Sequence, residues 1–187
     1  MKKYIKLLII TLIIILSVFL LVKSSSKVPS KEGVGMKISS PAFEHNGAIP
    51  SKYTCDGEDV SPPLVFEGIP ENAASLALIA DDPDAPMGTW VHWVIYNIPP
   101  TSGGLTENFP SDSKLDDGSL QGMTDFRRVG YGGPCPPSGA HRYFFKLYAL
   151  DKKLDLPAGA TKQQVETAMK GHIIAQDQLI GIYKRSK

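Results

Sequence analysis

The chain has 187 residues, 42% of them hydrophobic, which is enough to bury one core and is most simply organised as a single folded domain. Twenty basic and 19 acidic residues give a formal net charge of +1. Residues 1–31 hold six of the basic residues and no acidic ones, so the remainder has 14 basic and 19 acidic residues, a net charge of −5. We expect no nucleic-acid partner for an acidic domain that lacks a basic stripe.

The N-terminal segment has the composition of a targeting sequence. Lys2, Lys3 and Lys6 precede the uncharged run LLIITLIIILSVFLLV, residues 7–22. A basic start followed by an apolar run is typical of a signal peptide or a membrane anchor, and the length of this run leaves both open. Lysines ahead of the run predict an N-terminus inside and a domain outside. Residues 1–22 therefore predict an extracytoplasmic protein that is either membrane-anchored or secreted.

The sequence after this segment predicts mostly strands. Residues 23–35, KSSSKVPSKEGVG, have the composition of a linker, and the folded domain is expected over residues 36–187. Short β-branched or aromatic runs bounded by Pro, Gly, Asp or Ser indicate strands. Three runs are strong and two, which contain prolines, are weaker. They are SLALIA (75–80), WVHWVIYNI (90–98) and HRYFFKLYAL (141–150), then MKISSPAF near 36 and PPLVFEG near 63.

One helix is expected near the C-terminus. In TKQQVETAMKGH, Thr161 and Gln164 form a capping-box pattern, and Gly171 offers a stop. The following IIAQDQLIGIYKR fits a helix or a strand, and we predict a final strand. The fold class is therefore mainly β, a β-sandwich with a small peripheral helix. Residues 101–133, polar and rich in glycine, are expected to form a surface loop.

Polar and aromatic residues recur in pairs two positions apart, and residues so spaced share a face of a strand. Trp90 and His92 form one pair, with Val91, Trp93 and Ile95 predicted on an apolar opposite face. The other pairs are His141 with Tyr143, and Asp82 with Asp84 around Pro83. Each pair alone has an ordinary explanation as a turn, a strand end or a core aromatic. Their repetition beside rigid proline and glycine loops favours a shared pocket.

Two motifs resemble the phosphatidylethanolamine-binding protein family, also called Raf kinase inhibitor-like proteins. They are DDPDAPMGTWVHWVIYNIP and GYGGPCPPSGAHRYFFKLYALD, and the resemblance covers roughly residues 36–185 and is greatest for the compact branch of bacteria and archaea. It implies a β-sandwich with a small anion-binding cavity at one end. The implied ligand-binding positions are Asp82, Asp84, Pro86, Trp90, His92, Pro136, Pro137, His141 and Tyr143.

These residues predict the binding of a small anion without chemical turnover and without a cofactor. Cationic histidines beside a carboxylate, and backbone N–H groups of the loop 131–139, are suited to bind phosphate or carboxylate. Trp90 and an aspartate would receive an ammonium group. The expected ligand is a phosphate-type anion or a phospholipid head group, and the membrane is a further expected partner through the N-terminal segment.

Two other functions remain open at this point. Family members are associated with the inhibition of kinases or serine proteases, which implies an extracytoplasmic protease as a possible partner, bound through the loop 101–133. Alternatively, Asp82, His92 and His141 would ligate a metal and support hydrolysis, although no usual metal-ligand spacing is present. The only cysteines, Cys55 and Cys135, form either a disulfide or two separate buried thiols.

Overall fold

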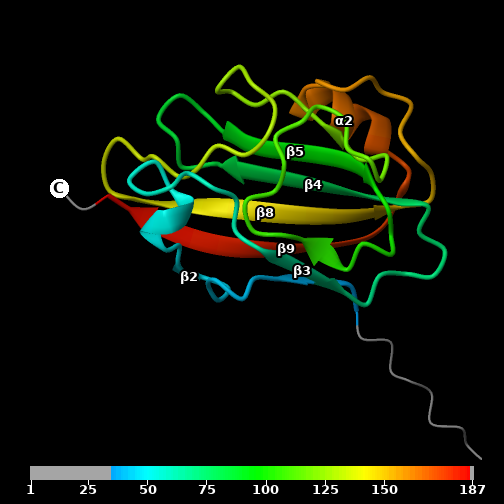
Figure 1. The fold of residues 1–187 in the computed structure, drawn as a ribbon, viewed down its shortest axis with the longest axis horizontal. Helices are drawn as coiled ribbons and strands as arrows, with labels where there is room; N and C mark the ends of the chain where they lie inside the picture. The colour runs from blue at the N-terminus through cyan, green and yellow to red at the C-terminus, as the bar shows by residue number, and fades with distance from the viewer. Residues whose placement is uncertain (1–34, 186–187) are drawn as a thin grey trace, which may run out of the picture. The chain divides into compact units, whose positions relative to one another are not determined.

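A computed structural model describes residues 35–185 (Figure 1). The predicted signal or anchor segment, residues 1–22, and all of the predicted linker except its last residue lie outside the described residues. Among residues 35–185, no helix has the length and apolar character needed to cross a membrane.

The described residues form two β-sheets and one α-helix. The larger sheet has six strands, antiparallel except for one parallel pair between β2 and β9. Its order is β2 (Gly47–Ala48), β9 (Ile173–Lys184), β8 (Ala140–Leu150), β4 (Ser75–Asp82), β5 (Trp90–Ile98) and β7 (Leu120–Gln121). The smaller sheet consists of β1 (Lys37–Ser39), β3 (Leu64–Glu67) and β6 (Gly104–Leu105). A short 3₁₀ helix, η1 (Ser51–Tyr53), follows β2.

Both faces of the larger sheet are buried at β4 and β5, which explains why β4 is an almost continuous apolar run, whereas β8 and β9 have one face partly exposed. Leu76 and Leu78 belong to a core shared with the smaller sheet, whereas Ala77 and Ile79 pack with residues of the helix α2 (Lys162–Met169). Figure 1 shows β5, β4, β8 and β9 side by side, with α2 near β5. The mainly β fold with one short helix near the C-terminus is confirmed.

The helix α2 begins and ends where the sequence predicted. Thr161 is its N-cap: the side chain accepts a hydrogen bond from Gln164 N–H, and the Gln164 side chain accepts one from Thr161 N–H at 2.8 Å, which completes a capping box. Gly171 follows the C-cap with a φ of +82°, a left-handed conformation that glycine adopts without steric cost.

An extra residue interrupts the pairing of β5 with β4. Asp81 pairs with Val91 and Ala80 pairs with Trp93, so His92 has no partner of its own on β4. Such a β-bulge resets the alternation of side chains along the strand.

The bulge overturns one sequence-based prediction. We expected Val91, Trp93 and Ile95 to share a face, and this was wrong. Trp93 and Ile95 pack into the core between the sheets, whereas Val91 packs on the face that α2 covers. With the bulge, His92 lines the cavity while the next residue, Trp93, packs into the core between the sheets.

The stretch from 101 to 133 is more ordered than a simple surface loop because it contributes β6 and β7 and is held by one buried amide. Gln121, which is fully buried, accepts a hydrogen bond from Trp93 Nε1 at 2.8 Å. Its amide nitrogen donates to the carbonyl oxygens of Pro110 and Asp112 at 2.7 and 2.9 Å. This glutamine ties the stretch to β5, together with backbone hydrogen bonds such as that from Gly122 N–H to the Val94 carbonyl oxygen.

Candidate functional site

A small cavity opens at one end of the larger sheet, with a volume of about 220 Å³. The ends of β4, β5 and β8 supply its walls together with the Asp-Pro turn and the proline loop. Eight of the nine ligand-binding positions predicted from the sequence lie in its lining. The lining consists of Asp82, Ala85, Pro86, Trp90, His92, Phe126, Cys135, Pro136, Pro137, His141 and Tyr143.

The strand ends bring a carboxylate and an imidazole together in this lining. Asp82 ends β4, and its Oδ2 accepts a hydrogen bond from His141 Nδ1 of β8 at 2.7 Å. Both side chains are buried, with exposed fractions of 5% and 9%. A carboxylate has no proton to donate at neutral pH, so Nδ1 of His141 is the protonated nitrogen. Asp82 therefore fixes the orientation and tautomer of His141.

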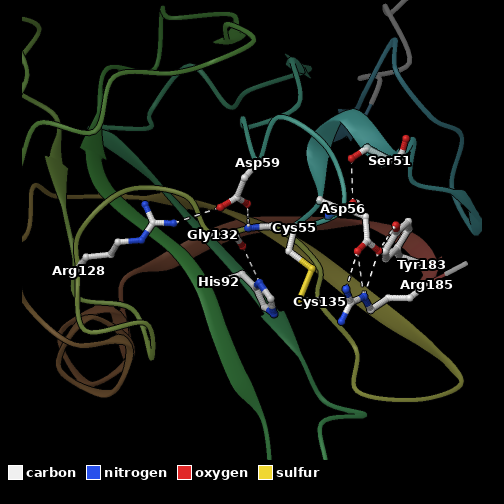
Figure 2. Close-up of a disulfide and its surroundings, with 12 residues drawn as sticks. Ser51, Cys55, Asp56, Asp59, His92, Arg128, Gly132, Cys135, Tyr183 and Arg185 are labelled. Carbon is white, nitrogen blue, oxygen red and sulfur yellow. Dashed lines mark hydrogen bonds and ion pairs between the residues drawn. A yellow bond between two sulfur atoms is a disulfide. The ribbon is translucent and has the colours of Figure 1, made fainter. Parts of the chain in front are cut away.

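The second histidine has a different partner. His92 Nδ1 lies 2.6 Å from the carbonyl oxygen of Gly132, as Figure 2 shows. The rings of Phe126 and Tyr143 contact the imidazole edge-to-face, with centroid distances of 5.3 and 5.1 Å. Burial lowers the pKa of His92 and outweighs the opposing effects of the Gly132 carbonyl and the nearby Asp82. His92 is therefore a neutral ring at pH 7, which corrects the expectation of two cationic histidines.

Tyr143 places a buried hydroxyl group beside the two histidines. The residue is 2% exposed. The N–H of Cys135 is directed at its hydroxyl oxygen, but the hydroxyl itself donates to no described residue. Burial, together with the charge of Asp82, raises the pKa of Tyr143 well above its ordinary value. The hydroxyl thus stays protonated, and its proton has no acceptor among the described residues. Buried hydroxyl groups in this state are uncommon in folded proteins.

The proline loop forms one wall of the cavity, and only part of its backbone is free to donate. Gly132 N–H donates to the His92 carbonyl oxygen at 3.0 Å and Gly133 N–H donates to Asp59 Oδ1 at 2.7 Å. Its three prolines have no N–H, and the N–H of Cys135 is directed at the Tyr143 hydroxyl. The N–H groups of Ser138 and Gly139 have no partner among the described residues.

A disulfide fixes this wall. Cys135 lines the cavity and is bonded to Cys55, 80 positions earlier in the chain (Figure 2). The N–H of Cys55 also donates to the carbonyl oxygen of Pro134 at 3.2 Å. Gly132 packs against the ring of Phe126 so closely that a Cβ would lie 2.4 Å from the Cε2 atom, so only glycine fits there. The loop is therefore held by one covalent bond and by close packing.

Asp84 is the predicted site residue that the structure places outside the cavity. The strand β4 ends at Asp82, so alternation no longer relates the two aspartates. Asp84 Oδ1 accepts from Arg142 Nη2 at 2.7 Å and Oδ2 accepts from Nε at 2.8 Å. Arg142 points away from the cavity because it alternates with His141 and Tyr143 along β8. The carboxylate of Asp84 thus holds the Asp-Pro turn against β8.

This ion pair gives a prediction about pH. The hydrogen bonds from the Arg142 side chain lower the pKa of Asp84 from 3.8 to about 2. A carboxyl group with a lowered pKa in the folded state stabilises the fold above its ordinary pKa, and this contribution is lost as the pH falls toward 2. Because Arg142 is half exposed, salt will screen the effect. In Arg142→Gln, we expect the carboxyl carbon of Asp84, followed by NMR, to titrate near its ordinary value. An unchanged midpoint would contradict this assignment.

Three lining residues were not predicted from the sequence. Ala85 lies inside the recognised motif but carries no polar group, and Cys135 was considered only as a disulfide or a thiol. Phe126 comes from the stretch 101–133, where no periodicity marks which side chain turns inward. Its ring packs edge-to-face on Trp90 with a centroid distance of 5.6 Å. No sequence pattern available here indicates that contact.

The residues considered for metal hydrolysis are not arranged as ligands. Within residues 35–185, no group of three His, Cys, Asp or Glu side chains is placed to hold a metal ion. Asp82 and His141 bond to each other, and His92 Nδ1 bonds to a backbone carbonyl.

Several known proteins are similar to this chain in sequence and in fold. The sequence model of the phosphatidylethanolamine-binding protein family matches residues 39–184. A UPF0098 protein of Methanothermobacter thermautotrophicus is 59% identical over 150 residues, which are 80% of this chain and 99% of that protein. A UPF0098 protein of Aquifex aeolicus is 50% identical over 162 residues, 85% of this chain and 94% of that protein.

Solved structures agree with these sequence relationships. A phosphatidylethanolamine-binding protein homologue from Chlamydia trachomatis has a TM-score of 0.75 and 41% identity, over 81% of this chain and 99% of that one. Escherichia coli YbcL, described as a member of the mammalian PEBP family, has a TM-score of 0.75 and 31% identity over the same shares. The fold and the cavity define a β-sandwich protein of the ligand-binding class. The chain belongs to the phosphatidylethanolamine-binding protein family.

Proposed function

We propose that the cavity binds a small oxyanion, such as phosphate or the phosphate of a phospholipid head group, and does not convert it chemically. The observation that carries this proposal is the buried Asp82–His141 pair next to the hydroxyl of Tyr143, whose proton has no acceptor among the described residues. A protonated His141 would donate a charge-assisted hydrogen bond to the anion, and Tyr143 would donate a second.

The size of the cavity supports a ligand no larger than a head group. Its volume of about 220 Å³ is below the 300–1,000 Å³ that is typical of sites for drug-sized ligands. A phospholipid would therefore bind through its head group, with its acyl chains outside. A free phosphate or carboxylate would use the same donors.

The aromatic side of the cavity supports an additional contact with a cation. Asp82 and Asp84, which we expected to receive an ammonium group, are already paired with His141 and Arg142. Trp90 and Phe126 remain, and aromatic faces attract cations. The positive end of a zwitterionic head group would therefore lie against these two rings.

A titration tests the proposal. We expect inorganic phosphate and phosphoethanolamine to shift the NMR resonances of cavity residues, and we expect His141→Ala to weaken both ligands at least about tenfold, since hydrogen bonds to charged groups contribute roughly 1.5–3 kcal/mol. Vesicles with and without phosphatidylethanolamine distinguish a membrane lipid from a free anion.

The chain provides a matched control for this variant. His172 forms the same kind of pair, with Nδ1 2.9 Å from Asp151 Oδ1, but it lies outside the cavity and is exposed. His172→Ala should leave binding unchanged. Binding that is absent in the wild-type protein, or equally weak in the two variants and the wild type, would refute an anion site in this cavity.

A further inference from the structure

The two ring nitrogens of His92 have separate surroundings. Because a carbonyl oxygen only accepts hydrogen bonds, Nδ1 must carry the proton that it shares with Gly132. Figure 2 shows the other ring nitrogen turned away from Gly132. Nε2 bonds to no described residue and is not one of the side-chain atoms buried without a partner. Since the ring lines the cavity, Nε2 faces the space that a ligand would occupy.

The groups around this ring keep Nε2 without a proton. Phe126 and Tyr143 cover the imidazole, and burial lowers the pKa of His92. Carboxylates nearby oppose this effect, but they are weaker than burial. The titratable and charged groups near the ring or elsewhere in its wall are Asp81 and Asp82 of β4, Asp125 of the stretch 101–133, and His141 and Tyr143 of β8. Nε2 is therefore a hydrogen-bond acceptor in a site otherwise suited to an anion.

An acceptor inside an anion site discriminates among anions. An oxygen without hydrogen would meet the lone pair of Nε2 and be repelled, whereas an O–H or N–H group would donate to it. We propose that His92 makes the cavity selective for oxyanions that carry a hydrogen on the group facing Nε2, so that hydrogen phosphate, a protonated phosphate monoester or an amine-bearing phosphate binds more tightly than a fully deprotonated oxyanion. This inference rests on the proposed function, because it assigns the specificity of the same cavity.

The two histidines then have different tasks. His141 is the ring that Asp82 orients through Nδ1, and it is proposed to bind the anion. His92 remains neutral, and its Nε2 accepts a hydrogen bond from the ligand. A ligand that leaves a buried polar group of the site unpaired binds with much lower affinity than a ligand that pairs with it.

Hydrogen phosphate and sulfate provide the decisive comparison. At about pH 8 both are tetrahedral dianions of similar size, and they differ mainly in one O–H group. We expect hydrogen phosphate to bind the full chain at least about tenfold more tightly than sulfate, measured by calorimetry or NMR titration. In His92→Gln, the amide N–H₂ group can donate a hydrogen bond. We expect the affinity for sulfate to rise relative to that for phosphate, so that the ratio of the two affinities falls toward one.

A second measurement on the wild-type protein does not depend on the folding of that variant. Methyl phosphate loses its last proton near pH 6, so its affinity relative to sulfate should fall about tenfold or more between pH 5.5 and pH 8. A constant ratio, or equal affinities for phosphate and sulfate, would overturn the selectivity and leave the anion site standing. Absence of binding for all three anions would instead refute the proposed function itself.

Discussion

The double substitution Lys146→Met and Lys162→Met is expected to destabilise the protein by about 3–5 kcal/mol, because it leaves a buried carboxylate without a cation. Asp81 of β4 is fully buried. Lys146 Nζ of β8 lies 2.8 Å from its Oδ1 and donates to its Oδ2 at 2.9 Å. Lys162 Nζ of α2 lies 2.7 Å from Oδ2. These two cations are the ion-pair partners of Asp81 among the described residues.

Each single substitution should cost much less than the pair, because one lysine remains beside the carboxylate. Adding Asp81→Asn to the double variant removes the charge and should recover more than half of the lost stability, since replacing every member of a buried ionic group is often nearly neutral. The free energy of unfolding of each variant is measured by chemical denaturation. Lys153→Met with Lys170→Met is the control, as both lysines are exposed and form no ion pair among residues 35–185. If Asp81→Asn fails to rescue the double variant, uncompensated charge is not the cause of the loss.

Removing the disulfide should have a comparable effect. In the chain-entropy account, a cross-link between positions 80 residues apart raises the free energy of the unfolded chain by about 4.5 kcal/mol. Removal of a native disulfide lowers the stability of a protein by roughly 2–5 kcal/mol. For a domain of this size we expect the Tm of Cys55→Ala with Cys135→Ala to fall by about 10 °C. Phosphate affinity should fall as well, because Cys135 lies in the cavity wall.

The wild-type protein with and without reductant is the matched comparison, since it changes the bond and not the sequence. A Tm that reductant does not lower would contradict the assigned role. Disulfides persist in oxidising compartments, and we propose on this basis, together with the lysine-led apolar segment, that the domain functions outside the cytoplasm. Thiols found free in protein extracted from its source without reductant would argue against this location.

Much of the fold followed from local pattern. The capping box at Thr161 and the glycine at Gly171 are local signals, so the helix was predictable at both ends. The strong strands were predictable because apolar runs bounded by turn residues occupy the buried sheet. The bulge at His92 was not predictable, because it arises from the pairing of β5 with β4 and leaves no mark in the sequence of either strand.

The candidate site, too, could be predicted from the sequence only in part. Spacing by two grouped Trp90 with His92, and His141 with Tyr143, correctly within their strands. It failed for Asp84 because the strand had already ended, and a nearby arginine determines where that carboxylate points. It also could not distinguish the two histidines, because the acceptor that each Nδ1 meets, a carbonyl oxygen for His92 and a carboxylate for His141, is determined only after folding.

The bulge in β5 has an evolutionary consequence. It makes a ligand-facing imidazole and a core indole consecutive residues, so an insertion or deletion in this strand would displace both together and be eliminated by selection on folding. New ligand preferences in such a lineage would therefore arise in the segments 83–89 and 122–137, which form the remaining walls and can diverge while the sheet stays intact.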